Sequence, residues 1–466
     1  MSAISSYERE SLISDPLHGY VTFTAARKSG EIAEQSLIDH PWVQRLRRIH
    51  QLQSAWWVYP TAEHTRFQHV LGAMHLAGRA ASHLYTSLCR ACEGEAVPSR
   101  AYVESLVRVA ALLHDVGHGP YGHFFDDHFL NQFSLTHEDL GRHIILTELA
   151  ELIRGIRNNP HGELAAQEVL QPEQVAFLVK RPTEVNETVP SWLRLLRTLF
   201  CGVYTVDNMD FVLRDSYMAG HGPRAFDLDR LLHYSFFTPR GLTLHAKGLA
   251  ALVHFMEARG ELFRSLYFHR TVRSIDLTMA DLFRPTMDRL FPGNPLEHLG
   301  SYRALTEWSL LVDVERWRDD ADPELRRLGE AWQGVLQRRL EWKMACERTI
   351  RFEQGESEGT SIFTDADLVE RRVRARLPAA LRALPFRGDV ARHYHRPISA
   401  VAVRQNFVYE PATGQIRSLA EHELFARLPV SFSVCRLYAR DHTHDAELAT
   451  ALDRLLLASG DEKTNM

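Results

Sequence analysis

The sequence predicts a mostly α-helical protein that begins with a small β hairpin and ends in a smaller α+β unit. Three observations support this fold class. Apolar residues recur at helical spacing through about residue 290. The start, SLISDPLHGYVTFT (residues 11–24), has short extended runs on both sides of a Pro-x-x-Gly turn. Residues 398–419 and 432–441 have the composition of strands.

The helices can be placed from their start signals and their apolar spacing. In LIDHPWVQRLRRIHQLQ, residues 37–53, we expect a helix with Asp39 as N-cap and Pro41 in its first turn. Its predicted core positions are Trp42, Leu46, Ile49 and Leu52. A helix over residues 65–92 has small residues for close packing at Gly72, Ala73, Ala77 and Ala80. The next begins at Ser99 and stops at Gly117, Gly119 and Pro120. Further helices are expected within residues 193–220, 250–283 and 303–350.

Bulk composition excludes several classes of protein. The chain has 466 residues, which suggests two or three packed units. A formal charge of -5 gives no general attraction to nucleic acid or to anionic membranes. No apolar run approaches the roughly 20 residues that cross a bilayer, so no membrane association is expected. The five cysteines are scattered and no secretion signal opens the chain, which predicts a cytoplasmic protein.

Residues 109–129, VAALLHDVGHGPYGHFFDDHF, place four histidines and three aspartates directly after an apolar run. Burying such groups without partners costs several kcal/mol each, so we expect a specific role for them. An imidazole and a carboxylate, as in His114 and Asp115, suit a divalent cation. Alone, this dipeptide is better explained as a helix cap. With His69 and Asp207, which lie on other predicted helices, it makes a plausible metal shell with positions left for water and substrate.

These residues stand in longer strings that resemble a known family. The strings are DPLHGY, RLRRIHQL, YPTAEHTRFQH, HDVGHGPYGH, LTHEDLG, VDNMDFVLRD and LYFHRTVRSID, in this order from about residue 15 to residue 276. They resemble the HD-domain superfamily of metal-dependent phosphohydrolases. Within it they are similar to the deoxynucleoside triphosphate (dNTP) triphosphohydrolases, a branch that includes enzymes with a sterile-alpha-motif and an HD domain and bacterial dGTPase-like proteins.

The resemblance implies a domain division and a metal site. We expect an HD-type phosphohydrolase domain over residues 1–295, with its HD core at about 60–220, a helical extension over 296–352 and an α+β domain over 353–466. The implied metal ligands are His69, His114, Asp115 and Asp207. The implied metal is divalent: Mn, Fe, Ni, Zn or Mg. The implied reaction is attack of water on the α-phosphorus of a dNTP, which releases deoxynucleoside and intact triphosphate.

The same resemblance assigns catalytic and substrate-binding residues. His118, His123 and His137 match positions around the triphosphate, and Asp126 and Glu138 match carboxylates that orient those imidazoles. His137 with Glu138, and His123, are the expected proton carriers, because histidine titrates near neutral pH; polar helix caps are the alternative. The implied substrate contacts are Arg66 for phosphate, Gln51, Leu52 and Asp215 for the sugar, and Phe211. Core packing is an equal alternative for Leu52.

Two positions depart from the family pattern. Asn208 stands where the animal enzymes have Lys, and Phe211 stands where they have Tyr. The first change removes a charge from the triphosphate cradle, and the second removes a hydroxyl that could hold the sugar. His269, Arg270 and Arg273 are candidates to supply the missing charge, with Arg270 as the expected substrate contact.

The implied partners are a dNTP substrate, an allosteric nucleotide and further copies of the chain, from dimer to hexamer. The basic run from Glu370 to Arg396 could bind nucleotide phosphates or nucleic acid, but a solvated face or a subunit contact is favoured. Two other functions stay open at this point. One is a phosphodiesterase, nucleotidase or nuclease of the same superfamily; the other is a nucleotide-sensing oligomer without catalysis.

Overall fold

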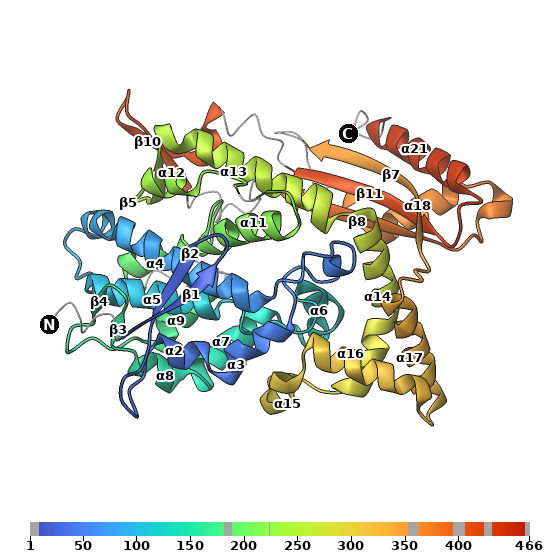
Figure 1. Cartoon of the computed structure of the whole chain (residues 1–466). Coiled ribbons are helices and arrows are strands. Elements are labelled where there is room, and N and C mark those ends of the chain that lie inside the picture. Colours follow the sequence, from blue (N-terminus) through green and yellow to red (C-terminus); the bar gives the residue numbers. More distant parts are fainter. Residues whose placement is uncertain are drawn as a thin grey trace. The chain divides into compact units, whose positions relative to one another are not determined.

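The computed structural model describes residues 9–180, 189–222, 224–352, 362–394, 406–423 and 431–461. The chain forms two compact units (Figure 1). The first contains Met1–Arg259, Met287–Asp313 and Ser399–His422, and the second contains Gly260–Thr286, Val314–Ile398 and Glu423–Met466. Most described residues are helical, a β hairpin stands at the N-terminus, and the C-terminal region mixes helices with strands. The predicted fold class is therefore confirmed.

The N-terminal hairpin pairs β1 (Glu10–Asp15) with β2 (Gly19–Thr24) in antiparallel register. Asp15 organises the turn, because its Oδ1 accepts hydrogen bonds from the backbone nitrogens of Leu17, at 2.9 Å, and His18, at 3.0 Å. Gly19 closes the turn with a φ of +72°, a conformation that glycine adopts without steric cost. The hairpin thus carries two polar side chains, Asp15 and His18, at a fixed position in its turn.

The first unit is built on helices. They are α2 (Glu34–Ile38), α3 (Pro41–Gln44), α4 (Arg66–Ala91), α5 (Arg100–Leu113), α6 (His123–His128), α7 (His137–Thr147), α8 (Ala150–Gly155), α9 (Pro172–Val179), α10 (Ser191–Arg197), α11 (Val206–Met218), α12 (Leu228–His233) and α15 (Leu299–Ala304). Three more helices have residues in both units: α13 (Leu249–Leu262), α14 (Arg270–Leu290) and α16 (Glu307–Arg316). Among the described residues, no helix combines the length and apolarity that crossing a membrane requires.

The centre of this unit is the pair α4 and α5, which lie side by side (Figure 1). Every residue of α5 from Tyr102 to Leu113 is buried, including Arg108. Arg108 is compensated by Glu34, with Nε 2.6 Å from Oε1 and Nη2 2.9 Å from Oε2. A Cβ at Gly78 of α4 would lie 2.8 Å from Nη1 of Arg108, so a glycine lets this buried ion pair fit between the helices. The small residues predicted to allow close packing on α4 are buried.

The helix predicted over residues 37–53 is wrong in its middle. Asp39 is the C-cap of α2 rather than an N-cap, and His40 caps α3 by accepting a hydrogen bond from the backbone nitrogen of Trp42 at 3.3 Å. After α3, a 3₁₀ turn at Arg45–Arg48 leads to extended backbone at Ile49. This backbone pairs with the segment before α4, because Arg66 N donates to Ile49 O at 3.0 Å. The four predicted core positions are nevertheless buried.

Two small sheets complete the first unit. One joins β5 (Ser235–Thr238), β6 (Gly241–His245), β9 (Asn406–Glu410) and β10 (Gln415–Ser418) in the order β10-β9-β6-β5. In it β9 runs parallel to β6, so a strand from the C-terminal stretch belongs to the first unit. The other pairs β3 (Asn158–Asn159) with β4 (Gly162–Glu163). Residues 398–405, part of the predicted strand region, lie outside the described residues.

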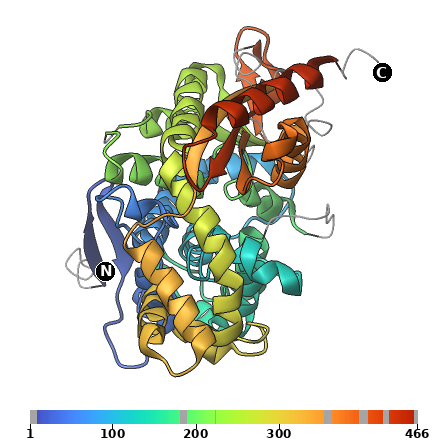
Figure 2. The same cartoon turned by 90° about the vertical axis from the view of Figure 1, so that its right-hand side faces the viewer.

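The second unit is an antiparallel sheet covered by helices. Its strands are β7 (Lys343–Phe352), β8 (Phe386–Tyr394) and β11 (Ser431–Ala439), in the order β7-β11-β8. Its helices include α17 (Pro323–Leu336), α18 (Ala366–Arg376) and α21 (Asp445–Asp461). Figure 2 shows the C-terminal helix, in red, lying against the strands of this unit. One apolar cluster joins the sheet to α18 and α21, and another packs β11 against the segment Phe263–Phe268. The central strand β11, predicted near residues 432–441, is therefore buried along its whole length.

Residues 343–350 were predicted as helix and are a strand. They pair with β11 along β7, with one register shift beside Ala345, and this tertiary pairing overrides local helix preference. The division into three domains predicted from the sequence stays a prediction.

Candidate active site

Four side chains from three helices meet at one place in the first unit. His69 lies in the first turn of α4, His114 and Asp115 follow the end of α5, and Asp207 lies in the first turn of α11. Nε2 of His69 lies 3.3 Å from Nε2 of His114 and 3.1 Å from Oδ1 of Asp207. Nε2 of His114 lies 3.4 Å from Oδ1 of Asp115 and 3.6 Å from Oδ1 of Asp207. The structure thus brings together all four predicted metal ligands.

The imidazoles of His69 and His114 each direct the Nε2 lone pair toward the other three side chains of this group, because the Nδ1 atom of each ring is hydrogen-bonded to an acceptor. Nδ1 of His114 lies 2.7 Å from the carbonyl oxygen of Ala111 and must donate to it. Nδ1 of His69 lies 2.8 Å from Oδ2 of Asp210 and donates to that carboxylate. In each neutral ring Nε2 is then the acceptor, and the two acceptors face each other beside two carboxylates. This donor set fits a divalent metal ion, whose charge would offset their mutual repulsion.

The pKa shifts of these residues also indicate that the group they form stabilises a positive charge. Burial lowers the pKa of His69, but hydrogen bonds with Asp207 and Asp210 outweigh burial and raise it to about 10. Burial raises the pKa of Asp207, but hydrogen bonds with His114 and His69 outweigh it, and the pKa ends below its usual value. The pKa of Asp115 also ends well below its usual value, because His114 and Arg66 outweigh burial. Both carboxylates therefore stay ionised and available to a cation.

A second layer of charged residues holds His69 in place. Asp210, which has no exposed surface, accepts hydrogen bonds from three side chains. These are His69, His18 at 2.7 Å and Arg214, whose Nε and Nη2 each lie 2.9 Å from one carboxylate oxygen. Arg214 in turn donates to Asp15 at 2.9 Å. The turn of the N-terminal hairpin is therefore connected to a predicted metal ligand through one buried network.

Sequence reasoning missed this second layer. His18, Asp210 and Arg214 stand in the DPLHGY and VDNMDFVLRD strings, but neither spacing nor periodicity shows that the two strings meet. Close packing of α4 makes the meeting possible. A Cβ at Gly72 would lie 2.0 Å from Oδ1 of Asp210 and 2.3 Å from Nη2 of Arg214, so only glycine leaves room for the network.

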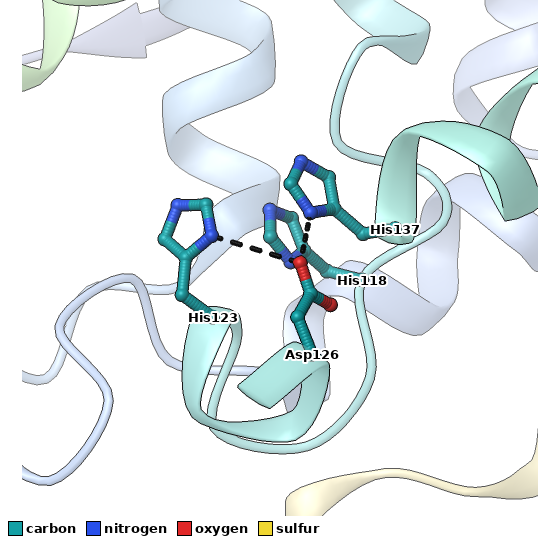
Figure 3. Close-up of side chains that lie close together, drawn as sticks. All are labelled: His118, His123, Asp126 and His137. Atoms are coloured by element: carbon teal, nitrogen blue, oxygen red, sulfur yellow. Dashed lines mark hydrogen bonds and ion pairs between the residues drawn. The ribbon is translucent and has the colours of Figure 1, made fainter. Parts of the chain in front are cut away.

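A second group of titratable side chains lies next to the first. Figure 3 shows His118, His123 and His137 gathered around Asp126. Oδ2 of Asp126 is hydrogen-bonded to Nδ1 of His137 and lies 3.8 Å from Nδ1 of His123. The rings of His118 and His137 are stacked with centroids 3.7 Å apart. Nε2 of His118 lies 3.3 Å from Oδ1 of Asp115, so His118 connects this group to the four residues above.

The members of this second group differ in exposure and charge. The side chain of His118 is buried, whereas that of His123 is 63% exposed. Burial and the nearby Arg66 and His137 lower the pKa of His118 well below its usual value, which keeps that ring neutral. Burial raises the pKa of Asp126, but the neighbouring imidazole of His123 and the hydrogen bond with His137 outweigh burial and lower it. The carboxylate that is hydrogen-bonded to His137 is that of Asp126, whereas the sequence predicted Glu138 as its partner. Glu138 is half-buried and follows His137 in the first turn of α7.

Two glycines, Gly117 and Gly122, explain how the loop that carries His118 reaches its position. A Cβ at Gly117 would lie 2.0 Å from the backbone oxygen of His137, so the start of α7 packs directly on the loop backbone. Gly122 has a φ of +58°, and its Cβ would lie 2.3 Å from Nη2 of Arg66. Glycine is therefore required at both positions, at the first for close approach and at the second for conformation as well.

The predicted phosphate contact, Arg66, already has a partner. It is buried at the start of α4 and donates from Nη1 to Oδ2 of Asp115 at 2.6 Å. The other predicted substrate contacts in this unit are Gln51 and Phe211, both half-buried, and Leu52 and Asp215, both buried. His64, which the sequence reading left without a role, is 2.7 Å from Oδ1 of Asp215 through Nε2.

The predicted contact from the second unit is Arg270, an exposed residue at the start of α14. Two neighbouring candidates behave differently from it. Arg273 is paired with Asp389, with Nη2 2.6 Å from Oδ1, and His269 is half-buried. Arg273 therefore has a structural partner within its own unit.

Comparison with known proteins gives a match to one domain family. Residues 66–183 match the HD domain. The chain therefore contains a segment that is similar to the HD domain. The matched segment of the HD domain contains His69, His114 and Asp115, while Asp207 follows it in the sequence.

Relatives of this chain include an uncharacterized protein, YwfO, of Bacillus subtilis, which is 27% identical over 335 residues, 68% of this chain and 69% of that protein. A protein of Dictyostelium discoideum named as a homolog of the deoxynucleoside triphosphate triphosphohydrolase SAMHD1 is 25% identical over 346 residues. That alignment covers 72% of this chain but only 60% of the Dictyostelium protein, so the chain spans less than two thirds of this relative.

Among solved structures, a phosphohydrolase from Bacteroides thetaiotaomicron superposes with a TM-score of 0.64, at 19% identity, over 92% of this chain and 99% of that one. At this identity the superposition shows a shared fold.

Proposed function

We propose that this protein is a metal-dependent HD-domain phosphohydrolase that cleaves dNTPs to deoxynucleoside and triphosphate. The observation that carries the proposal is the meeting of His69, His114, Asp115 and Asp207, with both Nε2 lone pairs facing inward. The SAMHD1 name of several relatives supports the dNTP class of substrate. A divalent ion held by these four residues would polarise phosphate oxygens and lower the pKa of a water molecule.

The second group of residues supplies the proton chemistry. In the proposed reaction a water oxygen bonds to the α-phosphorus while the bond from phosphorus to the 5′-oxygen breaks, and the 5′-oxygen takes up a proton. His123 is assigned as the donor, because its imidazole is the exposed member of the group and lies beside Asp126. Asp126 also orients His137 by a hydrogen bond to Nδ1. His118, kept neutral by burial, adds no positive charge beside Asp115.

Substrate recognition is proposed for residues around these two groups. The hydrogen bond from His64 holds the carboxylate of Asp215 in one orientation, as a sugar contact requires. Gln51 presents an amide next to the buried Leu52, which would restrict the space beside the sugar. Arg66 must exchange or share its contact with Asp115 to bind phosphate. Activation by a nucleotide and assembly into homo-oligomers stay predictions.

A product assay tests the proposal. The purified chain is incubated with Mn²⁺, Fe²⁺, Ni²⁺, Zn²⁺ or Mg²⁺ and with each dNTP, each NTP or an oligonucleotide, singly and in mixtures that include candidate effectors. We expect deoxynucleoside and triphosphate in equal amounts. The double variant His114→Ala, Asp115→Ala should lose the activity and the bound metal together.

The chain contains its own matched control. His444 and Asp445 form a second His-Asp dipeptide, at the start of α21 in the second unit. The double variant His444→Ala, Asp445→Ala should retain activity and metal. Release of a monophosphate or of single phosphate would replace the proposal with a phosphodiesterase or nucleotidase function. Equal behaviour of the wild type and the His114, Asp115 variant would favour a nucleotide-sensing protein without catalysis.

A further inference from the structure

Glu307 is a buried carboxylate at the start of α16, far along the chain from the loop 117–121 that carries His118. Its side chain has no exposed surface. Oε1 accepts hydrogen bonds from two backbone nitrogens, that of His50 at 3.1 Å and that of Tyr121 at 2.9 Å. Oε2 lies 2.5 Å from Nδ1 of His50. One side chain therefore holds together two stretches of backbone that are 71 residues apart in the sequence (50 and 121).

The residues just before Glu307 hold the same two stretches. The hydroxyl of Tyr302 donates to the carbonyl oxygen of Gly117 at 2.7 Å. The buried guanidinium of Arg45 donates from Nη2 to Leu305 O at 2.9 Å and from Nη1 to His118 O at 2.5 Å. Segment 302–307 thus contacts the loop 117–121 and the stretch 45–50 through side-chain hydrogen bonds to the backbone. We call residues 302–307 the clamp segment.

The two stretches held by the clamp segment carry residues of the proposed site. The loop 117–121 contains His118 and leads directly into His123, and the stretch 45–50 leads directly into Gln51 and Leu52. Tyr121 has a φ of +63°, a conformation unfavourable for a bulky side chain, and its nitrogen donates to Glu307. Without that acceptor the loop would relax toward ordinary backbone angles.

The charge of Glu307 is balanced locally. Burial lowers the pKa of His50, but its hydrogen bond with Glu307 outweighs burial and the pKa is raised. Nε2 of His50 also lies 3.2 Å from Glu63, and the ring stacks on Trp56 with centroids 4.5 Å apart. A buried carboxylate with three donors is costly to replace, because removing it leaves the donors without an acceptor.

We propose that Glu307 is a positioning residue of the active site. It fixes the loop that carries His118 and His123 relative to the stretch that carries Gln51 and Leu52. Part of this inference rests on the proposed function, since its catalytic consequence requires dNTP hydrolysis. Its structural consequence, a loosened loop, can be measured without any activity.

The test compares Glu307→Ala, Glu307→Gln and Tyr302→Phe with Glu315→Gln as matched control. Glu315 lies on the same helix and is exposed. Hydrogen exchange is measured on peptides covering residues 45–53 and 117–125. Metal content, kcat and KM are also measured, and all measurements are made at a temperature well below the melting temperature of each variant. For Glu307→Ala we expect at least about 10-fold faster exchange in both peptides. We expect roughly 100-fold lower kcat, since small misplacements of reacting groups have effects of this size, with metal content unchanged.

The variants separate positioning from simple stabilisation. Glu307→Gln keeps one acceptor oxygen for the two backbone nitrogens, so its exchange and kcat should lie between those of wild type and Glu307→Ala. Tyr302→Phe should speed exchange in the 117–125 peptide alone, and it serves as the test if Glu307→Ala does not fold. A lower melting temperature with wild-type exchange in both peptides and wild-type kcat would overturn the proposal. If the wild type does not hydrolyse dNTPs, the proposed function fails, and the exchange result still decides the role of Glu307 in the fold.

Discussion

Replacing Asp210 by Asn tests how far the buried network of Asp210, His18 and Arg214 controls the proposed metal site. The substitution keeps the shape of the side chain but turns one of its two oxygens into an NH₂ donor. Oδ1 faces His18 and Nη2 of Arg214, and Oδ2 faces His69 and Nε of Arg214. If the NH₂ takes the Oδ2 position, His69 loses its acceptor, and if it takes the Oδ1 position, His69 keeps only a neutral amide oxygen, which is a weaker acceptor than a carboxylate.

The size of the effect follows from these contacts. Removing one partner of a buried ion pair costs about 3 to 5 kcal/mol when it leaves the other charge uncompensated. Arg214 keeps Asp15 at 2.9 Å, so we expect the lower part of that range, about 3 kcal/mol of unfolding free energy. Loss of the hydrogen bond that orients a metal-binding histidine weakens metal binding roughly 10- to 100-fold. Both losses should appear in the same variant.

The assay is a metal titration of the purified apo-protein, with Mn²⁺ or Ni²⁺ followed by competition and by elemental analysis, alongside urea unfolding. Asp229→Asn is the matched control, because Asp229 is 82% exposed and pairs with Arg79 at the surface. It should change neither quantity. If Asp210→Asn binds metal with wild-type affinity while losing stability, the network supports the fold only and the reasoning about His69 is refuted.

Two further predictions follow from the surroundings of single residues, and a third follows from the sequence. Gly72→Ala places a methyl group 2.0 Å from Oδ1 of Asp210. It should lower the free energy of unfolding by about 1 to 3 kcal/mol and weaken metal binding as well. Wild-type metal affinity would contradict this prediction. Burial and the nearby His18 lower the pKa of His75 to about 4, so the stability from its neutral form is complete above pH 6.5 and is lost as pH falls toward 4. Urea unfolding of wild type should lose up to about 2 kcal/mol from this group between pH 7.5 and pH 5, and His75→Gln should remove that part of the slope; parallel pH profiles would refute it. Arg270→Ala should raise KM for dNTP, and an unchanged KM would exclude Arg270 as a phosphate contact.

Local patterns were sufficient for many elements and for naming the four candidate metal ligands, which the structure brings together. The apolar spacing of α4 and α5 and the glycines after Leu113 predicted where the two core helices lie and where the second ends. The ligands could be named because each stands in a string that resembles a family motif. Local patterns failed where a distant segment competes for the backbone. Residues 49–51 pair with the segment before α4, and residues 343–352 pair with β11, so neither stretch is helical.

The amino-acid sequence by itself identified the candidate cation-binding side chains and the helices on or beside which they lie, because motif strings and helical periodicity are local properties. Only the tertiary structure decided what surrounds them. Asp210 and Arg214 reach Asp15 and His18, and Glu307 reaches His50 and Tyr121, across separations of 186 residues or more. Such contacts depend on how helices pack, since buried charges are tolerated only where folding brings their partners within hydrogen-bond distance.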